Sequence, residues 1–193
     1  MHNGSRSAAN GGSYHVELEY ITMATTGNAT DFGDMPEARS GVSGSSNGIR
    51  GIFWSGNHNA TPAQIKEMEY ITIASTGNSA DFGNMVRIVN DHSSCGNADR
   101  NIAAGGYYGS LQDTIEYCNP ASTGNTSDFG NLITAQYMNQ CAETAIRGII
   151  TGGYGRVAHE NTIQYVTFAS TGNGTDFGNL AVGRYSHAGG SGT

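Results

Sequence analysis

A fifteen-residue motif that recurs four times is the feature that most constrains how this chain folds. It reads EYITMATTGNATDFG from Glu19, EYITIASTGNSADFG from Glu69, EYCNPASTGNTSDFG from Glu116 and QYVTFASTGNGTDFG from Gln164. The four starting residues are 50, 47 and 48 residues apart. A period of this length is typical of one propeller blade and too long for leucine-rich or ankyrin repeats. The repeat therefore predicts similar β units that follow one another along the chain.

Each copy of the motif reads as a strand, a turn and a second short strand. Tyr20 and Thr22 alternate with Ile21 and Met23, which places successive side chains on opposite faces of a strand. The Thr-Gly-Asn that follows tolerates the positive φ that a hairpin turn needs. Further Gly and Asn residues between copies favour four short strands per unit. Pro120 would remove a ladder hydrogen bond, so the third unit is expected to be the most irregular.

The composition agrees with a turn-rich β protein. The 193 residues include 29 glycines and only three prolines, and 37% of them are hydrophobic. A chain of this length can bury one core, so we expect a single domain over residues 1–193. The three cysteines, Cys95, Cys118 and Cys141, form no C-x-x-C pair, and we expect them to be reduced thiols.

Charge and hydropathy exclude two classes of partner. There are 9 basic and 16 acidic residues, a formal net charge of −7, and no run of Lys or Arg. This field repels a phosphate backbone, so we expect no nucleic-acid binding. No stretch reaches the roughly 18 apolar residues of a membrane span, so no membrane insertion is expected either. Residues 1–6 lack the apolar core of a signal peptide, which predicts a soluble protein made in a cytoplasm.

A second motif places an arginine five residues before a glycine pair. It occurs as Arg100 before Gly105-Gly106, as Arg147 before Gly152-Gly153, and with one glycine replaced as Arg50 before Ser55-Gly56. Together the two motifs resemble the kelch repeat, which has a glycine pair after its second strand, a Tyr in its third, an aromatic residue in its fourth and an Arg before the next blade. The matching positions are Gly105-Gly106, Tyr117, Phe129, and Arg39, Arg87 and Arg184 in the other units.

The resemblance covers nearly the whole chain and departs from kelch at one position. Phe32, Phe82, Phe129 and Phe177 stand where kelch repeats usually have Trp. The TGNxxDFG motif most resembles kelch-like repeats of predicted tail-fibre and other virion proteins of marine bacteriophages. The resemblance implies a four-bladed, all-β propeller with four antiparallel strands per blade, and it implies a place in a virion.

The two ends of the chain predict how such a ring would close. The last unit stops before any arginine and glycine pair, whereas Arg6 precedes Gly11-Gly12 at the usual offset. Residues 1–35 and 181–193 would therefore share one blade, in which 181–189 supply the first strand. A shared blade leaves no exposed sheet edge. The alternative is that the repeats join those of another chain end to end in a larger ring.

Repeated polar residues are candidates for ligand binding. Asp31, Asp81, Asp128 and Asp176 are weak candidates for calcium, and their alternative role is in Asx turns. Arg50, Arg100 and Arg147 would form a belt that binds an anionic ligand such as an acidic sugar, unless each pairs with a carboxylate. Trp54 is either a stacking platform for a sugar or partner, or part of a repacked blade.

No pattern predicts catalysis, a metal centre or a cofactor. The six histidines occupy non-equivalent positions, and there is no H-E-x-x-H and no G-x-S-x-G elbow.

We expect a non-enzymatic virion protein of a bacteriophage, an accessory, fibre or host-attachment module. Its partners would be other virion proteins, host-surface glycans or further copies of itself. The alternatives are a soluble carbohydrate-binding propeller and an enzyme with acids converging on its axis. The repeats differ most over 52–68 and 90–99, where we expect specificity to lie.

Overall fold

The computed structural model describes residues 15–58 and 64–190, and within them it has sixteen β-strands and no helix. The strands follow the repeat and fall into four units. Unit 1 has β1 (His15–Tyr20) and β2 (Thr30–Ser40). Unit 2 has β3 (Ser43–Ser46), β4 (Arg50–His58), β5 (Gln64–Thr72) and β6 (Ala80–Asn84). Unit 3 has β7 (Ser93–Gly96), β8 (Asn101–Ala104), β11 (Thr114–Cys118) and β12 (Ser127–Asn131). Unit 4 has β13 (Gln140–Glu143), β14 (Arg147–Thr151), β15 (Thr162–Thr167) and β16 (Thr175–Asn179).

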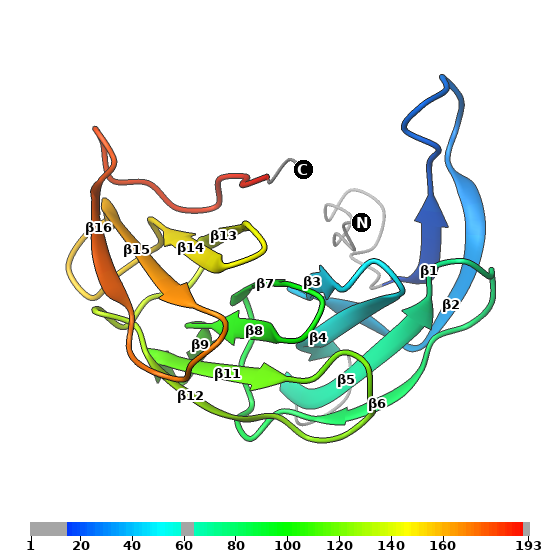
Figure 1. Cartoon of the computed structure of the whole chain (residues 1–193), viewed down its shortest axis with the longest axis horizontal. Coiled ribbons are helices and arrows are strands. Elements are labelled where there is room, and N and C mark those ends of the chain that lie inside the picture. The colour runs from blue at the N-terminus through cyan, green and yellow to red at the C-terminus, as the bar shows by residue number, and fades with distance from the viewer. Residues whose placement is uncertain (1–14, 59–63, 191–193) are drawn as a thin grey trace.

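The all-β, antiparallel fold is confirmed, and four-stranded up-and-down sheets form units 2, 3 and 4. Unit 1 joins unit 2 in a six-stranded sheet, because the end of β2 pairs with the end of β4 through Arg39 and His58. Unit 3 carries an extra two-stranded ribbon of β9 (Tyr107–Tyr108) and β10 (Ser110–Leu111). The sheets follow one another around an arc, with β3, β7 and β13 on its inner side (Figure 1).

The expected closed ring is not formed by these sheets. Unit 1 and β16 lie at opposite ends of an open arc (Figure 1). Residues 181–189 were expected to form the first strand of the shared blade, and they do not form a strand. This segment follows β16 in the chain, just as the inner strands β3, β7 and β13 follow β2, β6 and β12. Each inner strand pairs with the second strand of its unit, and the expected second strand, residues 6–12, lies outside the described residues.

The Asp-Phe-Gly of the repeat forms a β-bulge in the fourth strand of each unit. In unit 2, Met68 pairs with Gly83 and Glu69 with Asp81, so Phe82 is the extra residue. The same register shift occurs at Phe32, Phe129 and Phe177. The glycine that follows has a φ of +137° to +147° in all four copies, a conformation that residues with a Cβ rarely adopt.

Both faces of the third strand are covered by neighbouring units. Met68 and Glu69 are adjacent and both are buried, because Met68 packs in the cluster with unit 3 and Glu69 bonds to Arg39 of unit 1. The alternating strand expected over residues 20–24 is not formed in unit 1. In unit 1 the strand ends at Tyr20, and Ile21 and Met23 lie beyond it and are exposed. In each unit the extra Phe packs edge-on against the Tyr at the second position of the motif, as Phe82 does against Tyr70 with ring centroids 6.0 Å apart.

The hydrophobic core lies between consecutive units rather than inside any one of them. Phe32 of unit 1 packs with Phe53 and Ile71 of unit 2. Trp54 and Phe82 of unit 2 cluster with Cys118 of unit 3. The third cluster joins units 3 and 4 and contains Phe129, Ile102, Ile150, Val166 and Phe168. Because neither face of a sheet is buried by its own unit, each unit depends on its neighbours for stability.

Polar contacts repeat across the same boundaries, and we call each set a clasp. The Gly77 N–H of unit 2 donates to the Phe32 carbonyl of unit 1 at 2.7 Å, and the Asn78 Oδ1 accepts from the Asp34 N–H at 3.0 Å. The same two bonds recur with the same lengths at the next two boundaries, from Gly124-Asn125 to Phe82 and Asn84, and from Gly172-Asn173 to Phe129 and Asn131. The Thr-Gly-Asn turn of one unit thus holds the Asp-Phe-Gly segment of the unit before it.

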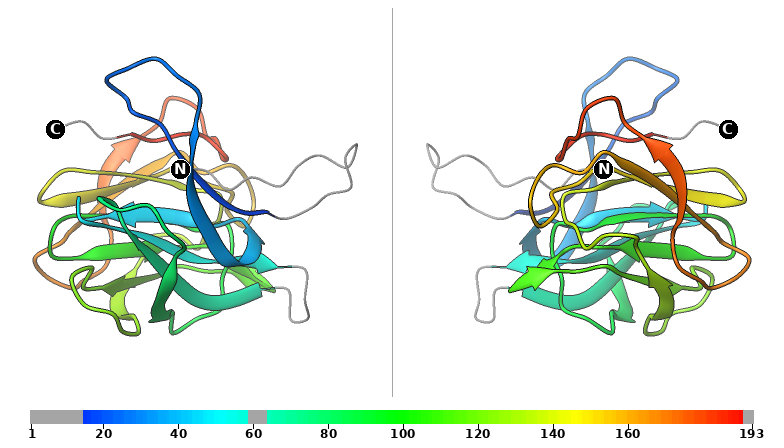
Figure 2. Two further views of the ribbon diagram at one scale, coloured as in Figure 1. Left: turned by 90° about the vertical axis from the view of Figure 1, so that its right-hand side faces the viewer. Right: turned by 90° about the vertical axis from the view of Figure 1, so that its left-hand side faces the viewer.

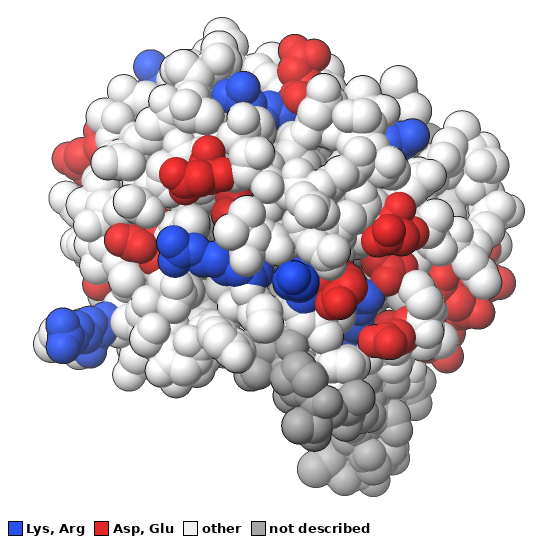
Figure 3. All heavy atoms as spheres, turned by 90° about the horizontal axis from the view of Figure 1, so that it is seen from below, with Lys and Arg blue, Asp and Glu red and all other residues white. Residues whose placement is uncertain are grey.

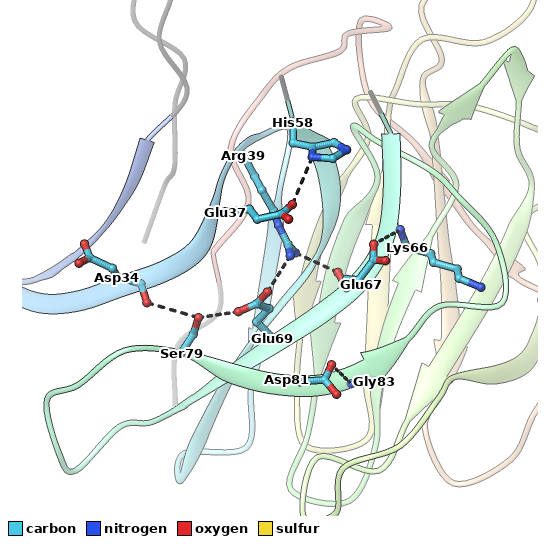
Figure 4. Close-up of polar contacts among 10 residues, drawn as sticks. All are labelled: Asp34, Glu37, Arg39, His58, Lys66, Glu67, Glu69, Ser79, Asp81 and Gly83. Atoms are coloured by element: carbon cyan, nitrogen blue, oxygen red, sulfur yellow. Dashed lines mark hydrogen bonds and ion pairs between the residues drawn. The ribbon is translucent and has the colours of Figure 1, made fainter. Parts of the chain in front are cut away.

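The first residue of the motif adds a buried polar contact at each boundary. Glu69 accepts a hydrogen bond from Arg39 of unit 1 at 2.6 Å, and both side chains are almost fully buried (Figure 4). The Glu69 carboxylate also accepts from the Ser79 hydroxyl at 2.6 Å. In the next unit Glu116 accepts instead from the backbone N–H groups of Val86 and Arg87. Burial raises the pKa of Glu116, and the bonds from Thr126, Val86 and Arg87 oppose this.

Two of the three cysteines form a disulfide, which the sequence did not predict. Cys95 of β7 and Cys141 of β13 are bonded, with Cα atoms 5.7 Å apart. They come from neighbouring inner strands, 46 residues apart in sequence, so spacing alone gave no sign that they meet. Cys118 is free and buried, as expected for a structural thiol, and burial raises its pKa to about 12.

Candidate ligand-binding face

Four equivalent segments, one following each unit's fourth strand, surround a pocket on the inner side of the arc. We call it the inner pocket, and its volume is about 630 Å³. Its lining comes from residues 41–44, 91–94, 138–141 with Glu143, and 186–190. Each segment occupies the same place in its repeat, so the pocket is a direct product of the repeated fold.

A left-handed residue turns each segment into the pocket. Gly41, Asp91, Met138 and Ser186 occupy equivalent positions with φ values of +65°, +53°, +52° and +50°. Three of the four carry a Cβ, and this conformation costs such residues of order 1 kcal/mol or more. Backbone hydrogen bonds hold them in a chain. The Met138 N–H donates to the Asp91 carbonyl at 2.7 Å, and the Ser186 N–H donates to the Met138 carbonyl at 3.0 Å.

Polar residues make up much of the pocket lining, alongside Val42 and Met138, and the described residues of the lining include no lysine or arginine. The His92 ring, the hydroxyls of Ser93 and Ser94 and the Asn139 Oδ1 are buried and have no hydrogen-bond partner within the described protein. Burial lowers the pKa of His92 to about 4, so the ring is neutral at pH 7. Uncharged donors and acceptors at these positions suit a ligand rich in hydroxyl groups better than an anion.

Two further titratable groups border the pocket. Burial raises the pKa of Asp91, and a hydrogen bond from the Asn90 side chain at 2.7 Å opposes that shift. The His187 Nε2 lies 2.9 Å from the Thr151 hydroxyl. Burial, with a smaller contribution from the charge of Arg184, lowers the pKa of His187. Both shifts favour the uncharged form of the group, and the Glu143 side chain also lines the pocket.

A row of aromatic rings runs beside the pocket, and the sequence analysis missed it. The tyrosine row consists of Tyr107, Tyr137, Tyr154 and Tyr185, with His159 packed against its last two members. Successive ring centroids are 5.6, 5.5 and 5.6 Å apart, and His159 lies 4.7 Å from Tyr185. Tyr107, Tyr154 and Tyr185 keep 38 to 43% of their surface exposed.

The repeat explains why these tyrosines meet. Tyr137 forms an isolated antiparallel bridge with Tyr154, and Asn90 forms the equivalent bridge with Tyr107. Tyr137 and Tyr185 each directly precede a left-handed residue of the pocket, which places the row at the edge of the pocket. A sequence signal existed, because Tyr follows Gly105-Gly106 and Gly152-Gly153, and Tyr also follows Gln136 and Arg184 at equivalent places.

The three arginines predicted to form an anion-binding belt stack on tyrosine rings instead. Arg50, Arg100 and Arg147 stand at equivalent positions at the starts of β4, β8 and β14, or directly before them. Each guanidinium lies over a Tyr ring of its own unit, at 4.6, 4.5 and 4.2 Å from the centroids of Tyr70, Tyr117 and Tyr165. Arg50 and Arg100 also donate to backbone carbonyls of the following unit, those of Pro120 and Phe168. None of the three lines the inner pocket or forms an ion pair among the described residues.

Trp54 lies in the core rather than at a binding surface. Its side chain is fully buried in the cluster between units 2 and 3, and its indole N–H donates to the Ser45 hydroxyl at 2.8 Å. Of the two roles considered for this ring, the structure shows the packing role.

The four candidate calcium aspartates are exposed and lie in the bulges. The Asp81 and Asp176 carboxylates accept from the N–H groups of Gly83 and Gly178, at 3.1 and 3.2 Å, as expected for Asx turns. Within the described ranges, no three His, Cys, Asp or Glu side chains are grouped so that they could hold a metal ion.

No protein-family model matches this chain, and no curated protein has a sequence significantly similar to it. The described residues include no helix long and apolar enough to cross a membrane. Charged side chains of both signs are interspersed on the face seen in Figure 3, with most of that surface uncharged.

Proposed function

We propose that the protein is a non-enzymatic attachment module that binds carbohydrate at the inner pocket and the tyrosine row. The scaffold would be a propeller-like array of kelch-like units. The observation that carries this proposal is the row of four partly exposed rings beside a polar pocket. A tyrosine ring offers a flat apolar face to the C–H side of a sugar and a hydroxyl for hydrogen bonding.

The pocket chemistry favours neutral sugars over acidic ones. Its described lining has hydroxyl, amide, imidazole and carboxyl groups and no Lys or Arg, so it has no cation to pair with an acidic sugar. The arginines first considered for an acidic sugar are stacked on tyrosines away from this pocket. A neutral oligosaccharide that lies along the row could place hydroxyl groups beside Ser93 and Asn139.

A place in a bacteriophage virion is part of the proposal and rests on the resemblance of the TGNxxDFG repeat. Mass spectrometry of purified particles from a phage that encodes this chain is the direct test. The chain should be detected at a stoichiometry comparable to that of tail proteins. Its absence from particles would leave the alternative of a soluble carbohydrate-binding protein.

The carbohydrate proposal is tested on a glycan array with the wild-type chain, Tyr154→Ala and Tyr108→Ala. Tyr154 contacts two other rings of the row, Tyr137 and Tyr185, and its neighbour His159. Tyr108 is 47% exposed, against 38% for Tyr154, and lies outside these ring contacts, which makes it a suitable control. We expect wild-type and Tyr108→Ala to bind the same neutral glycans, and Tyr154→Ala to bind at least roughly tenfold more weakly. Binding absent in the wild type, or equal in both variants, contradicts the proposal.

A further inference from the structure

The clasp has two halves, and the two ends of the arc each carry one half without a partner. The turn half is the Thr-Gly-Asn of a unit, and the bulge half is the Asp-Phe-Gly of the unit before it. Three boundaries contain both halves, with the same two hydrogen bonds at 2.7 and 3.0 Å. Unit 4 has a bulge half and unit 1 has a turn half, and neither is engaged among the described residues.

The bulge half of unit 4 is exposed where its equivalents are buried. Phe177 keeps 59% of its surface exposed, whereas Phe32, Phe82 and Phe129 keep 6, 1 and 2%. A Cβ built on Gly33, Gly83 or Gly130 would overlap the glycine carbonyl of the next unit's turn, and one built on Gly178 would meet nothing within 4 Å. Unit 4 therefore has the backbone shape of a clasp without the chain that fills it.

The apolar side chains beside the turn half of unit 1 are exposed, whereas equivalent side chains of later units are buried. Ile21 keeps 63% of its surface exposed, whereas its equivalents Ile71 and Val166 each keep 2%. Met23 is 95% exposed, and its equivalent in unit 4, Phe168, is 2% exposed. The hairpin that carries Gly27 and Asn28 projects beyond the rest of the molecule (Figure 2).

These two exposed surfaces correspond to the two sides of each existing core cluster. In each existing cluster a bulge Phe of one unit packs with the residue equivalent to Ile21 in the next, as Phe129 does with Val166. Among the described residues, Phe177 and Ile21 are the members of this pair that have no such neighbour. The repeated arginines follow the same pattern. Arg50 and Arg100 each donate to a backbone carbonyl of the following unit, whereas Arg147 of the last unit is exposed.

We infer that unit 4 of one chain binds unit 1 of a second copy of this chain, through a fourth clasp. Gly27 and Asn28 of the second copy would bond to the backbone of Phe177 and Asn179, and Ile21 would cover the Phe177 ring. A second copy is favoured over the chain's own first unit because the two halves lie at opposite ends of an open arc (Figure 1). The contact is head-to-tail, so its repetition builds either a closed ring of two or more chains or an open filament.

The experiment measures mass in solution by light scattering over a range of concentrations. The wild-type chain is compared with Phe177→Ser and with Ile133→Ser, which changes an apolar residue of similar exposure, 50%, within unit 3. We expect wild-type and Ile133→Ser to reach at least twice the chain mass of 20.1 kDa, and Phe177→Ser to stay at 20.1 kDa. A wild-type mass of 20.1 kDa at every concentration overturns the inference.

Cross-linking identifies which chain supplies the turn half. Chains carrying only Asn28→Cys are mixed with chains carrying only Asn179→Cys and treated with a short bis-maleimide. Linked pairs that contain one chain of each kind support the second-copy contact. A link that forms only inside a doubly substituted chain of 20.1 kDa shows closure on itself and overturns the inference. Both outcomes are independent of glycan binding, so they stand apart from the proposed function.

Discussion

Asn78, Asn125 and Asn173 show how one side chain per repeat joins neighbouring units. Each belongs to a turn of its own unit, and each Oδ1 accepts from a backbone N–H of the unit before it at 3.0 Å. Sequence reasoning assigned these residues to turns because Asn tolerates such geometry. It could not assign the partner, since the bonded N–H lies 44, 41 and 42 residues earlier in the chain.

Removing the Asn78 side chain should weaken the boundary between units 1 and 2. Asn78→Ala leaves the Asp34 N–H without its acceptor, and we expect a loss of about 1 kcal/mol in the free energy of unfolding. Asn28→Ala is the matched control, because Asn28 has no bond equivalent to those of Asn78, Asn125 and Asn173 among the described residues. Urea denaturation at submicromolar protein measures both. Equal losses in the two variants would mean that the clasp bond contributes nothing.

The buried histidine of the inner pocket predicts a pH dependence of stability. The pKa of His92 is lowered from 6.5 to about 4, because burial penalises the charged ring. Below pH 6.5 the unfolded chain binds a proton here and the folded chain does not, so stability falls as the pH drops from about 6.5 to 4. Above pH 6.5 neither state is protonated and the effect is absent. The full loss is about 3 kcal/mol.

Comparing wild type with His92→Gln isolates this effect from other titrating groups. We expect the difference in unfolding free energy between the two to shrink, or change sign, between pH 7.5 and pH 4.5, as measured by urea denaturation. Glu116 and Asp91, whose pKa values are raised, titrate in both proteins and cancel. A difference that is constant with pH would show that His92 ionises freely in the folded state.

At the scale of strands, the bulge at Asp-Phe-Gly couples one unit's fourth strand to the next unit's turn. Gly83→Ala should lose roughly 3 kcal/mol or more of unfolding free energy. The new methyl group adds backbone strain at φ +137° and overlaps the Gly124 carbonyl. Gly178→Ala adds the same strain at φ +142° without a neighbour, so a loss nearer 1 kcal/mol is expected from thermal and urea unfolding. If both variants lose the same amount, close packing at the clasp is unimportant.

The sequence predicted the elements and not their contacts. The spacing of the motif located the units, and the Thr-Gly-Asn and glycine-pair signals located turns that the structure contains. The bulge at Phe82 was not predictable from alternation, because one extra residue reverses the faces of the residues beside it. The tyrosine row was not predictable either, because it depends on which loops meet in space, as those of Tyr137 and Tyr154 do. Residues 90–99 were expected to carry specificity only because their sequence differs among the repeats.

At the scale of the whole molecule, the open arc follows from where the core lies. Each hydrophobic cluster joins two consecutive units, so the array gains one cluster per boundary, and among the described residues no cluster covers the outer face of either end unit. A repeat count alone cannot distinguish an array that closes on itself from one that continues into another chain. The exposed Phe177 at one end and Ile21 at the other are the observations that distinguish the described arc from a closed ring.

Because clusters act between neighbours, damage to one boundary should stay local. Phe53→Ala removes a buried ring from the cluster between units 1 and 2, at a cost of about 3 to 5 kcal/mol. We expect amide hydrogen exchange to quicken throughout β1 and β2, while β11 to β15 keep wild-type protection. Ile150→Ala, in the cluster between units 3 and 4, should produce the reverse pattern and serves as the control. Uniformly faster exchange in both variants would instead indicate one cooperative core, and the nearest-neighbour account of this fold would be wrong.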